Sequence, residues 1–412
     1  MKNLLLFFFL IFSTNTAFSQ EWEVIPYEDI TDESLRIISL FEDNEGNVWG
    51  GNSFAGRVIR WNGNTWEAIN NDVTLMDFES PSVYSIFQDS NDRVLFCSGD
   101  GIGVYENDTW SNINTSNADL TYNFAFDGIE HNGVLWFTSR ASLVSFDGTT
   151  WTTYEIPDAN WNALGLAAMD DGRIFVTIAN GDPIRRFDNG NWEVFGTDNS
   201  SVSSNYQYYV GKVDGETFWF GGPAGKGSLY ENGEFTPSSA LSNWGMGTDY
   251  FTEIAVDGAK DNVWFGSGYG LHHLDGDNWE TFDAGNSPMT SSEVLSLMIA
   301  QDGKIWFTTE NEILIYTPLS TSTTSENLLS SSIKLMPNPA TEFLQLDINR
   351  LDGTTSQAAQ IQIFDFNGKL VLTQQTAGQS SLNLDISHLP TGNYTLEYMD
   401  GKSTTTKRFI KQ

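Results

Sequence analysis

The chain has 412 residues, 54 of them acidic and 20 basic, so its formal net charge is −34. Such acidity argues against nucleic acid as a partner, because phosphate binding requires a basic surface. A single cysteine, Cys97, excludes an intrachain disulfide bond.

The first residues have the pattern of an export signal. A short basic start, Met1 to Asn3, precedes the apolar run Leu4 to Phe12, and small residues follow at Ala17 and Ser19. This pattern predicts a secretory signal peptide over residues 1–19. A membrane anchor is the alternative, but the apolar run is about half of the roughly 20 residues that a membrane-spanning helix needs. We therefore expect an exported mature chain with no transmembrane segment.

A repeated pattern occupies most of the mature chain. In each copy a turn rich in Asp, Asn and Gly precedes a short apolar strand with a large anchor residue. The seven anchors are Trp49, Leu95, Trp136, Phe175, Trp219, Trp264 and Trp306. Their spacing of 39 to 46 residues predicts the four-stranded blades of a propeller. Calcium loops are the alternative for the Asp-rich turns, but these turns lack the oxygen-ligand spacing of an EF-hand, so we expect no metal.

A second hairpin follows each of the first six anchors. Large, mostly aromatic residues flank its turn, and we expect a cross-strand contact in each pair. The pairs are Trp61/Trp66, Tyr105/Trp110, Phe146/Trp151, Phe187/Trp192, Tyr230/Phe235 and Leu274/Trp279. The seventh repeat ends near Pro318 without this last strand, whereas the segment Trp22 to Ile25 resembles it. We therefore expect an all-β fold in which residues 20–318 form a seven-bladed β-propeller closed by an N-terminal strand.

The charge changes sharply after the repeats. Between Glu21 and Pro318 there are 46 acidic and 12 basic residues, whereas residues 333–412 contain seven of each. The Ser/Thr-rich segment 319–332 predicts a linker between two domains. Residues 333–412 alternate apolar and polar positions between turns such as Asn367-Gly368, which predicts a small antiparallel β-sandwich.

Both domains resemble known families. The Asp-x-x-Gly-x-Val-Trp strand and the strand Gly270 to Leu274 resemble the two-component regulator propeller repeats of Bacteroidetes-type bacteria. Unlike those regulators, the chain contains no kinase or DNA-binding segment. The motifs at 337–344, 361–369 and 389–394, with the closing residues 407–411, look like a type A C-terminal sorting domain of the type IX secretion system. This resemblance implies the type IX secretion machinery as a partner, and release or attachment at the outer cell surface. The alternative is an independent sandwich domain for binding.

Candidate ligand-binding residues lie in the long connections. Tight hairpins are expected on one face of the propeller, so the irregular connections share the other face, and variable loops on a rigid scaffold usually carry function. Flat aromatic rings with a few polar groups suit an extracellular glycan or protein. The candidates are Tyr84, Tyr122, Phe124, Arg140, Trp161, Tyr208, Trp244, Tyr250 and Tyr269. The alternative is that several of these rings pack between blades.

Catalytic signatures are weak. His272 and His273 are adjacent in a strand, so their side chains point to opposite faces and cannot chelate one metal. Carboxylate pairs for glycoside hydrolysis could be assembled from Asp182, Asp249, Glu253 and Glu310, but so many acidic residues provide such pairs by chance. We therefore expect a secreted or surface-displayed binding module with no cofactor and no catalytic residues. The alternatives are a propeller-type polysaccharide lyase or hydrolase, or a structural component of the envelope.

Overall fold

The computed structural model describes residues 21–31, 34–53, 57–69, 82–240, 250–276 and 278–318, and shorter tail segments between 332 and 411. These tail segments are 332–336, 340–349, 359–365, 369–376, 381–390, 392–399 and 404–411. The chain divides into two compact units, Met1–Ser320 and Thr321–Gln412, which are described separately. The expected signal peptide, Trp244 and all of the expected linker except Ser332 lie outside the described residues.

Seven four-stranded antiparallel sheets form the described part of the first unit. Six of them are built from four consecutive strands each, in the orders β2–β5, β6–β9, β10–β13, β14–β17, β18–β21 and β22–β25. The strands are β2 (Ile37–Glu42), β3 (Val48–Asn52), β4 (Val58–Trp61), β5 (Trp66–Ile69), β6 (Val83–Gln88), β7 (Val94–Ser98), β8 (Gly101–Glu106), β9 (Thr109–Ile113), β10 (Gly128–His131), β11 (Val134–Ser139), β12 (Ser142–Phe146), β13 (Trp151–Glu155), β14 (Ala163–Ala168), β15 (Ile174–Ile178), β16 (Ile184–Asp188), β17 (Asn191–Phe195), β18 (Tyr209–Lys212), β19 (Phe218–Gly221), β20 (Ser228–Glu231), β21 (Glu234–Pro237), β22 (Phe251–Ala259), β23 (Asn262–Ser267), β24 (Gly270–Asp275) and β25 (Asn278–Phe282).

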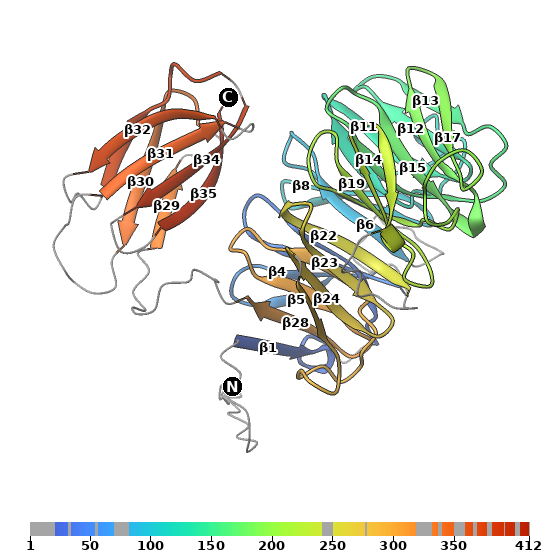
Figure 1. The fold of residues 1–412 in the computed structure, drawn as a ribbon, viewed down its shortest axis with the longest axis horizontal. Helices are drawn as coiled ribbons and strands as arrows, with labels where there is room; N and C mark the ends of the chain where they lie inside the picture. Colours follow the sequence, from blue (N-terminus) through green and yellow to red (C-terminus); the bar gives the residue numbers. More distant parts are fainter. Residues whose placement is uncertain are drawn as a thin grey trace. The chain divides into compact units, whose positions relative to one another are not determined.

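The remaining sheet joins both ends of this unit. Its order is β1-β28-β27-β26, with β1 at Glu21–Pro26, β26 at Ser296–Ile299, β27 at Ile305–Thr308 and β28 at Glu312–Thr317. The dark-blue β1 lies beside the brown β28 (Figure 1). Trp22 is opposite Tyr316 in the antiparallel register, with ring centroids 4.7 Å apart. The ring of Trp22 also lies 5.4 Å from that of Phe282 in the neighbouring sheet. The N-terminal strand thus occupies the place of a fourth strand.

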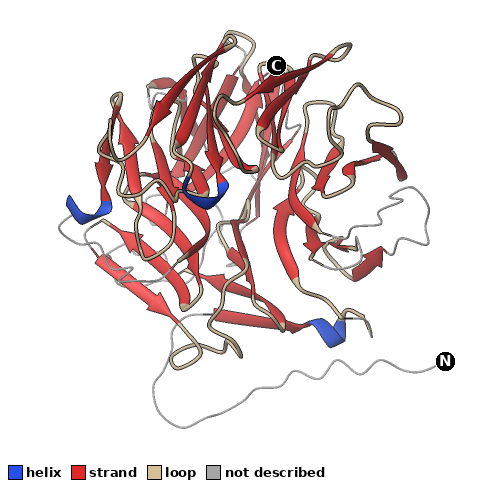
Figure 2. Ribbon diagram, turned by 90° about the vertical axis from the view of Figure 1, so that its right-hand side faces the viewer, coloured by secondary structure: helices blue, strands red, loops and turns tan. Residues whose placement is uncertain are grey.

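Helical structure is limited to short turns in the described residues. Figure 2 shows strands connected by loops, with 3-10 turns at Tyr27–Asp29, Ala179–Gly181 and Ser238–Ala240. The first strands of successive sheets are neighbours, and β26 is the neighbour of β2. Hydrogen bonds connect them: Ser39 Oγ donates to Val83 O at 3.0 Å, and Leu40 N donates to Ser296 Oγ at 3.1 Å. The sheets therefore follow one another in a propeller-like arrangement.

The repeated anchors form the contacts between sheets. Each lies in the second strand of its sheet, and Trp49, Trp219 and Trp264 are at most 2% exposed. Trp136 is only half-buried. The predicted cross-strand pairs are confirmed, because the five fully aromatic pairs have ring centroids 4.5 to 5.5 Å apart. Leu274 and Trp279 are likewise opposite each other in the register.

The acidic turn residue of the repeat has a structural role. Asp43 is buried, and its Oδ1 accepts hydrogen bonds from the backbone of Glu45 at 3.0 Å and Asn47 at 2.8 Å. Its Oδ2 accepts the indole N–H of Trp49 at 2.8 Å. One carboxylate thus closes the turn and fixes the anchor, which explains the Asp and the Trp of the motif by turn chemistry.

The second unit contains two antiparallel sheets around one core. A three-stranded sheet has the order β29-β30-β33, and a four-stranded sheet has the order β32-β31-β34-β35. Leu344, Leu346, Ile361, Ile363, Leu384 and Leu396 are fully buried between them. The strands are β29 (Ser332–Met336), β30 (Phe343–Asn349), β31 (Ala359–Asp365), β32 (Leu370–Thr376), β33 (Ser381–Asp385), β34 (Gly392–Met399) and β35 (Thr404–Lys411).

Candidate functional site

Exposed aromatic side chains gather at one end of the sheets of the first unit. This end, here called the loop face, carries the connections between second and third strands and those from each fourth strand to the next sheet. All six exposed aromatic side chains in the described part of this unit lie on it: Tyr122, Phe124, Trp161, Tyr206, Tyr250 and Tyr269, which are 37 to 62% exposed. Five of the nine predicted site residues are therefore solvent-exposed rings. Tyr206 was not among those nine, and Trp244 lies outside the described residues.

Tyr84 and Phe124 differ in environment: the Tyr84 ring is half-buried, whereas the Phe124 ring is exposed to solvent. Tyr84 is half-buried in β6, and its ring packs against that of Phe126 at 5.0 Å. Phe126 stacks in turn on the exposed Phe124 at 6.1 Å. The packing alternative therefore describes Tyr84 well, whereas Phe124 presents one ring face to solvent.

Arg140 connects two neighbouring loops of this face. Its guanidinium lies over the ring of Tyr122, 5.9 Å from the centroid, and its backbone forms an isolated antiparallel bridge with Asn162. A cavity of about 10 Å³ beneath Tyr122 and Phe124 is lined mainly by apolar side chains, including Leu120. This volume holds about one water molecule, so this cavity admits no larger ligand.

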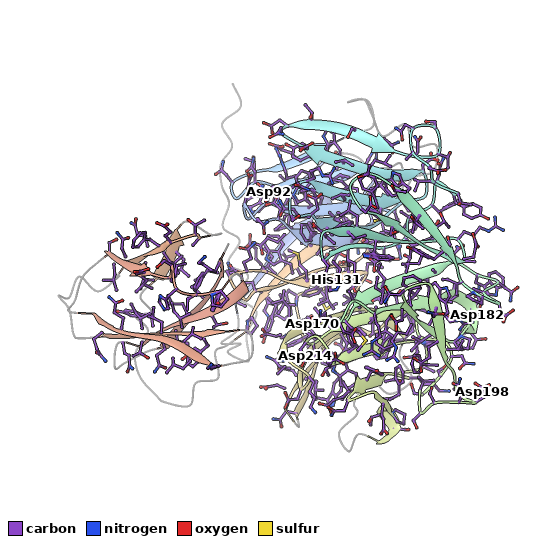
Figure 3. All side chains as sticks on the ribbon, turned by 90° about the horizontal axis from the view of Figure 1, so that it is seen from above. Asp92, His131, Asp170, Asp182, Asp198 and Asp214 are labelled. Atoms are coloured by element: carbon purple, nitrogen blue, oxygen red, sulfur yellow. The ribbon has the colours of Figure 1, made fainter. Side chains whose placement is uncertain are left out.

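Three connections meet at a group that we call the Trp161 patch: Trp161, Asp182, Tyr206 and Tyr208. The backbone N–H of Asn160 donates to Asp182 Oδ2 at 3.2 Å, which joins the first two connections. Gly181 lies flat against the ring of Tyr206, because a Cβ at this position would be 2.6 Å from that ring. The rings of Tyr206 and Tyr208 meet edge to face at 6.2 Å. In Figure 3, Asp182 and Asp198 lie on the opposite side of the unit from the hairpin residues Asp92, His131, Asp170 and Asp214.

Tyr250 and Tyr269 form the other exposed part of the face. The Tyr250 hydroxyl donates to Glu293 Oε1 at 3.1 Å, and Arg36 lies 3.8 Å from the same carboxylate. Burial and the Glu293 charge raise the pKa of Tyr250. Tyr269 is 62% exposed, the largest value among the rings of this face. The structure thus distributes the predicted residues along the face and does not bring them into one deep pocket.

A serine–histidine contact in β23 and β24 is structural. Ser267 Oγ lies 2.9 Å from His272 Nε2, and both side chains are at most 3% exposed. Ser267 also donates to Gly270 O at 3.1 Å, and Ser98 makes the same turn bond to Gly101 O at 2.8 Å. Burial lowers the pKa of His272 to about 4. The serine therefore closes a turn and is inaccessible to a substrate.

The two adjacent histidines make separate contacts, as expected. His273 stacks on Trp264 with ring centroids 3.8 Å apart, whereas His272 contacts Ser267 and Thr281. Over the described part of the chain, no three His, Cys, Asp or Glu side chains are grouped so that they could hold a metal ion.

Two half-buried carboxyl groups were not predicted as a pair. Asp127 precedes β10, accepts the Ser85 hydroxyl at 2.7 Å and accepts the Leu166 backbone N–H at 3.1 Å. Glu253 lies in β22, where its carboxylate accepts the backbone N–H of Ile254 at 3.2 Å. Burial raises the pKa of Asp127 to about 6. It raises the pKa of Glu253 to about 8, with a further contribution from the Asp127 charge.

The raised pKa values of Asp127 and Glu253 predict that the free energy of unfolding depends on pH. The folded state binds a proton at each carboxyl group more tightly than the unfolded chain does, so protonation stabilises the fold. This stabilisation is complete below about pH 4, the ordinary carboxyl pKa, and is lost as the pH rises through about 6 for Asp127 and about 8 for Glu253. We expect Glu253→Gln to weaken this loss, by up to about 1.4 kcal/mol per pH unit for one proton. Urea unfolding between pH 4.5 and 8.5 measures the effect. Glu234→Gln, at an exposed position, is the control, and equal pH slopes in wild type and Glu253→Gln would contradict the prediction.

Comparison with known proteins identifies the tail and the fold. Residues 334–412 match the secretion system C-terminal sorting domain family, which confirms the predicted type IX sorting domain. No curated protein matches the chain in sequence. The described residues contain no helix of the length and apolarity that crossing a membrane would require. The tail therefore places the protein outside the cell or at its surface.

Several solved structures resemble the chain. PorZ, a surface component of the type IX secretion system of Porphyromonas gingivalis, is 16% identical over 90% of this chain, with a TM-score of 0.56. The chain covers 58% of PorZ's own length. Virginiamycin B lyase from Staphylococcus aureus is 15% identical over 73% of this chain and 100% of its own, with a TM-score of 0.59.

A third similar structure is the extracellular domain of the hybrid two-component system BT4673 from B. thetaiotaomicron. It is 14% identical over 95% of this chain and 59% of its own length, with a TM-score of 0.58. At these identities the likeness shows the fold alone. It confirms an all-β, propeller-like chain and a relation of shape to extracellular regulator domains.

Proposed function

We propose that this protein, which carries a type IX sorting domain, is a secreted or surface-displayed recognition module. In this proposal, the seven sheets are the blades of one propeller, and β1 closes it as the fourth strand of the last blade. The loop face binds an extracellular glycan or protein. The observation that carries the proposal is the gathering of six exposed aromatic rings on that face. Exposed apolar groups that cluster on a surface mark interaction sites.

The arrangement of polar groups supports binding more than catalysis. Rings on the loop face are accompanied by Arg140, Asp182 and Glu293, which can orient a ligand by hydrogen bonds. The raised pKa of Glu253 would suit a general acid, and this side chain lies in the first strand of its sheet, three residues after the exposed Tyr250. A lyase or hydrolase thus remains the alternative, together with a structural envelope component.

Substitution of exposed rings is expected to remove binding. We expect Trp161→Ala and Tyr269→Ala to weaken the binding of a glycan or protein ligand about tenfold or more each, because aromatic anchors dominate interface energies. A glycan array and capture of extracellular proteins, both with the full exported chain, would identify the ligand and measure the loss.

Val194→Ala is the matched control, since Val194 is 39% exposed on β17, outside the loop face. Normal binding by Trp161→Ala and Tyr269→Ala would contradict the proposal. Turnover of a bound sugar, abolished by a single carboxylate substitution, would favour the enzyme alternative.

A further inference from the structure

The chain encloses one of its own arginines between aromatic rings and a carboxylate in the sheet β2–β5. The Arg60 guanidinium lies 5.2 Å from the ring centroid of Trp49 and 5.6 Å from that of Tyr105. The same guanidinium is 2.7 Å from Glu67 Oε2. Cation–π attraction and the carboxylate together stabilise such a group.

The sheet β14–β17 repeats this arrangement. The Arg186 guanidinium lies 5.1 Å from the ring centroid of Phe195 and 5.7 Å from that of Phe175. It forms an ion pair with Glu193 and donates to the Tyr230 hydroxyl at 2.5 Å. The same arrangement therefore occurs twice in the protein: a guanidinium contacts aromatic rings and pairs with a carboxylate.

The Trp161 patch has the same components without the cation. Trp161 and Tyr206 are 51% and 46% exposed, and Tyr208 contacts Tyr206 edge to face. Asp182 lies between the connections that carry these rings, because it accepts the Asn160 N–H and follows Gly181 beneath Tyr206. Within the described residues, no Lys or Arg lies within ion-pair distance of Asp182.

The arginine that interacts electrostatically with Asp182 cannot cover these rings. Arg185 interacts electrostatically with Asp182 and Asp158, but its side chain is 4% exposed and its Nη1 donates to Pro183 O at 2.7 Å. It lies within the sheet, and among the described residues no arginine or lysine makes a cation–π contact with Trp161, Tyr206 or Tyr208. The ring faces of the patch are therefore available to a cation from another molecule. The surrounding field favours such a cation, because the net charge of the whole chain is −34.

We propose that the Trp161 patch binds an arginine or lysine side chain of a basic partner protein. This inference rests on the proposed recognition function of the loop face and specifies its ligand. Arginine is the preferred residue, because its planar guanidinium can stack on a ring while it donates two hydrogen bonds to a carboxylate. Asp182 accepts these bonds, and Tyr206 and Trp161 provide the ring faces.

Fluorescence anisotropy with a labelled Arg-Gly-Arg-Gly-Arg peptide tests this inference on the full exported chain. Measurement at about 150 mM salt suppresses long-range attraction to the acidic surface. We expect the peptide to bind, and Asp182→Asn and Tyr206→Ala to weaken it about five- to tenfold each. Tyr206→Phe keeps the ring and is expected to bind normally. Glu234→Gln removes an equal charge at the hairpin end of β21 and should have no effect.

Three outcomes would overturn the inference. They are absence of peptide binding, normal binding by Asp182→Asn, or an equal loss with Glu234→Gln, which would indicate attraction to net charge alone. If a neutral glycan binds in a Trp161-dependent way while the peptide does not, the proposed function stands and this inference fails. If Tyr206→Ala unfolds, the comparison of Asp182→Asn with Glu234→Gln decides.

Discussion

A chain that lacks Glu21–Pro26 is expected to lose most of its stability and to aggregate. This segment is β1, and its six residues pair with Thr317 to Glu312 of β28. Removal would leave β28 as an unpaired edge of its sheet. It would also expose apolar residues of β28, because Ile313 to Tyr316 are at most 5% exposed in the complete sheet. Edges of this kind pair with other chains. Urea unfolding and size-exclusion chromatography of the truncated protein would measure the loss.

A single side chain carries much of this effect. Trp22 contacts the rings of Tyr316, Phe282 and Phe307 at 4.7, 5.4 and 6.1 Å. Because Trp22 is half-buried, we expect Trp22→Ala to destabilise the fold by about 2–3 kcal/mol, below the range for fully buried rings. This is a large fraction of a typical stability of about 5–15 kcal/mol. The control Val24→Thr changes an exposed position of the same strand and should stay within about 0.5 kcal/mol. If the truncated chain or Trp22→Ala unfolds like wild type, β1 has no closing role.

The strands could be predicted because their signals are local. Tight turns, an acidic residue such as Asp43 and an anchor such as Trp49 lie within seven residues of one another. The partner of Trp22 is distant in sequence, but repetition pointed to it, because each of the six other repeats has Trp or Phe at that position. The half-burial of Trp136 was not predictable, since the five tryptophan anchors look alike in sequence.

The candidate site was predicted only in outline. Loop-face exposure could be expected for Trp161 and Tyr269, but Tyr84 was included although its ring packs on Phe126. Tyr206 was expected on this face but was not chosen as a site residue, because its contact with Gly181, which lies 25 residues earlier in the chain, has no local signature. The coupling of Asp127 and Glu253 also depends on distant strands. Contacts between loops and between sheets have no local signature, so a single sequence does not contain them in readable form.

Deletion of residues 333–412 is expected to prevent delivery to the cell surface or medium and to retain the protein in the periplasm. These residues contain the sorting domain match at 334–412. They also belong to a unit with its own core, which includes Leu346, Ile363 and Leu396. The deletion therefore removes the sorting domain without removing any strand of the first unit. Cell fractionation and protease treatment of intact cells would locate the truncated chain.

The reciprocal experiment tests whether the tail is a sorting domain or an independent binding domain. If residues 319–412 are attached to an unrelated exported protein, we expect that protein to reach the surface or medium, because a sorting domain is read by the secretion machinery. An independent binding sandwich would not redirect its carrier. Circular dichroism of the truncated chain provides the control, since a folded but retained first unit shows that the export failure has no folding cause. Normal delivery of the truncated chain would contradict the sorting role of this tail.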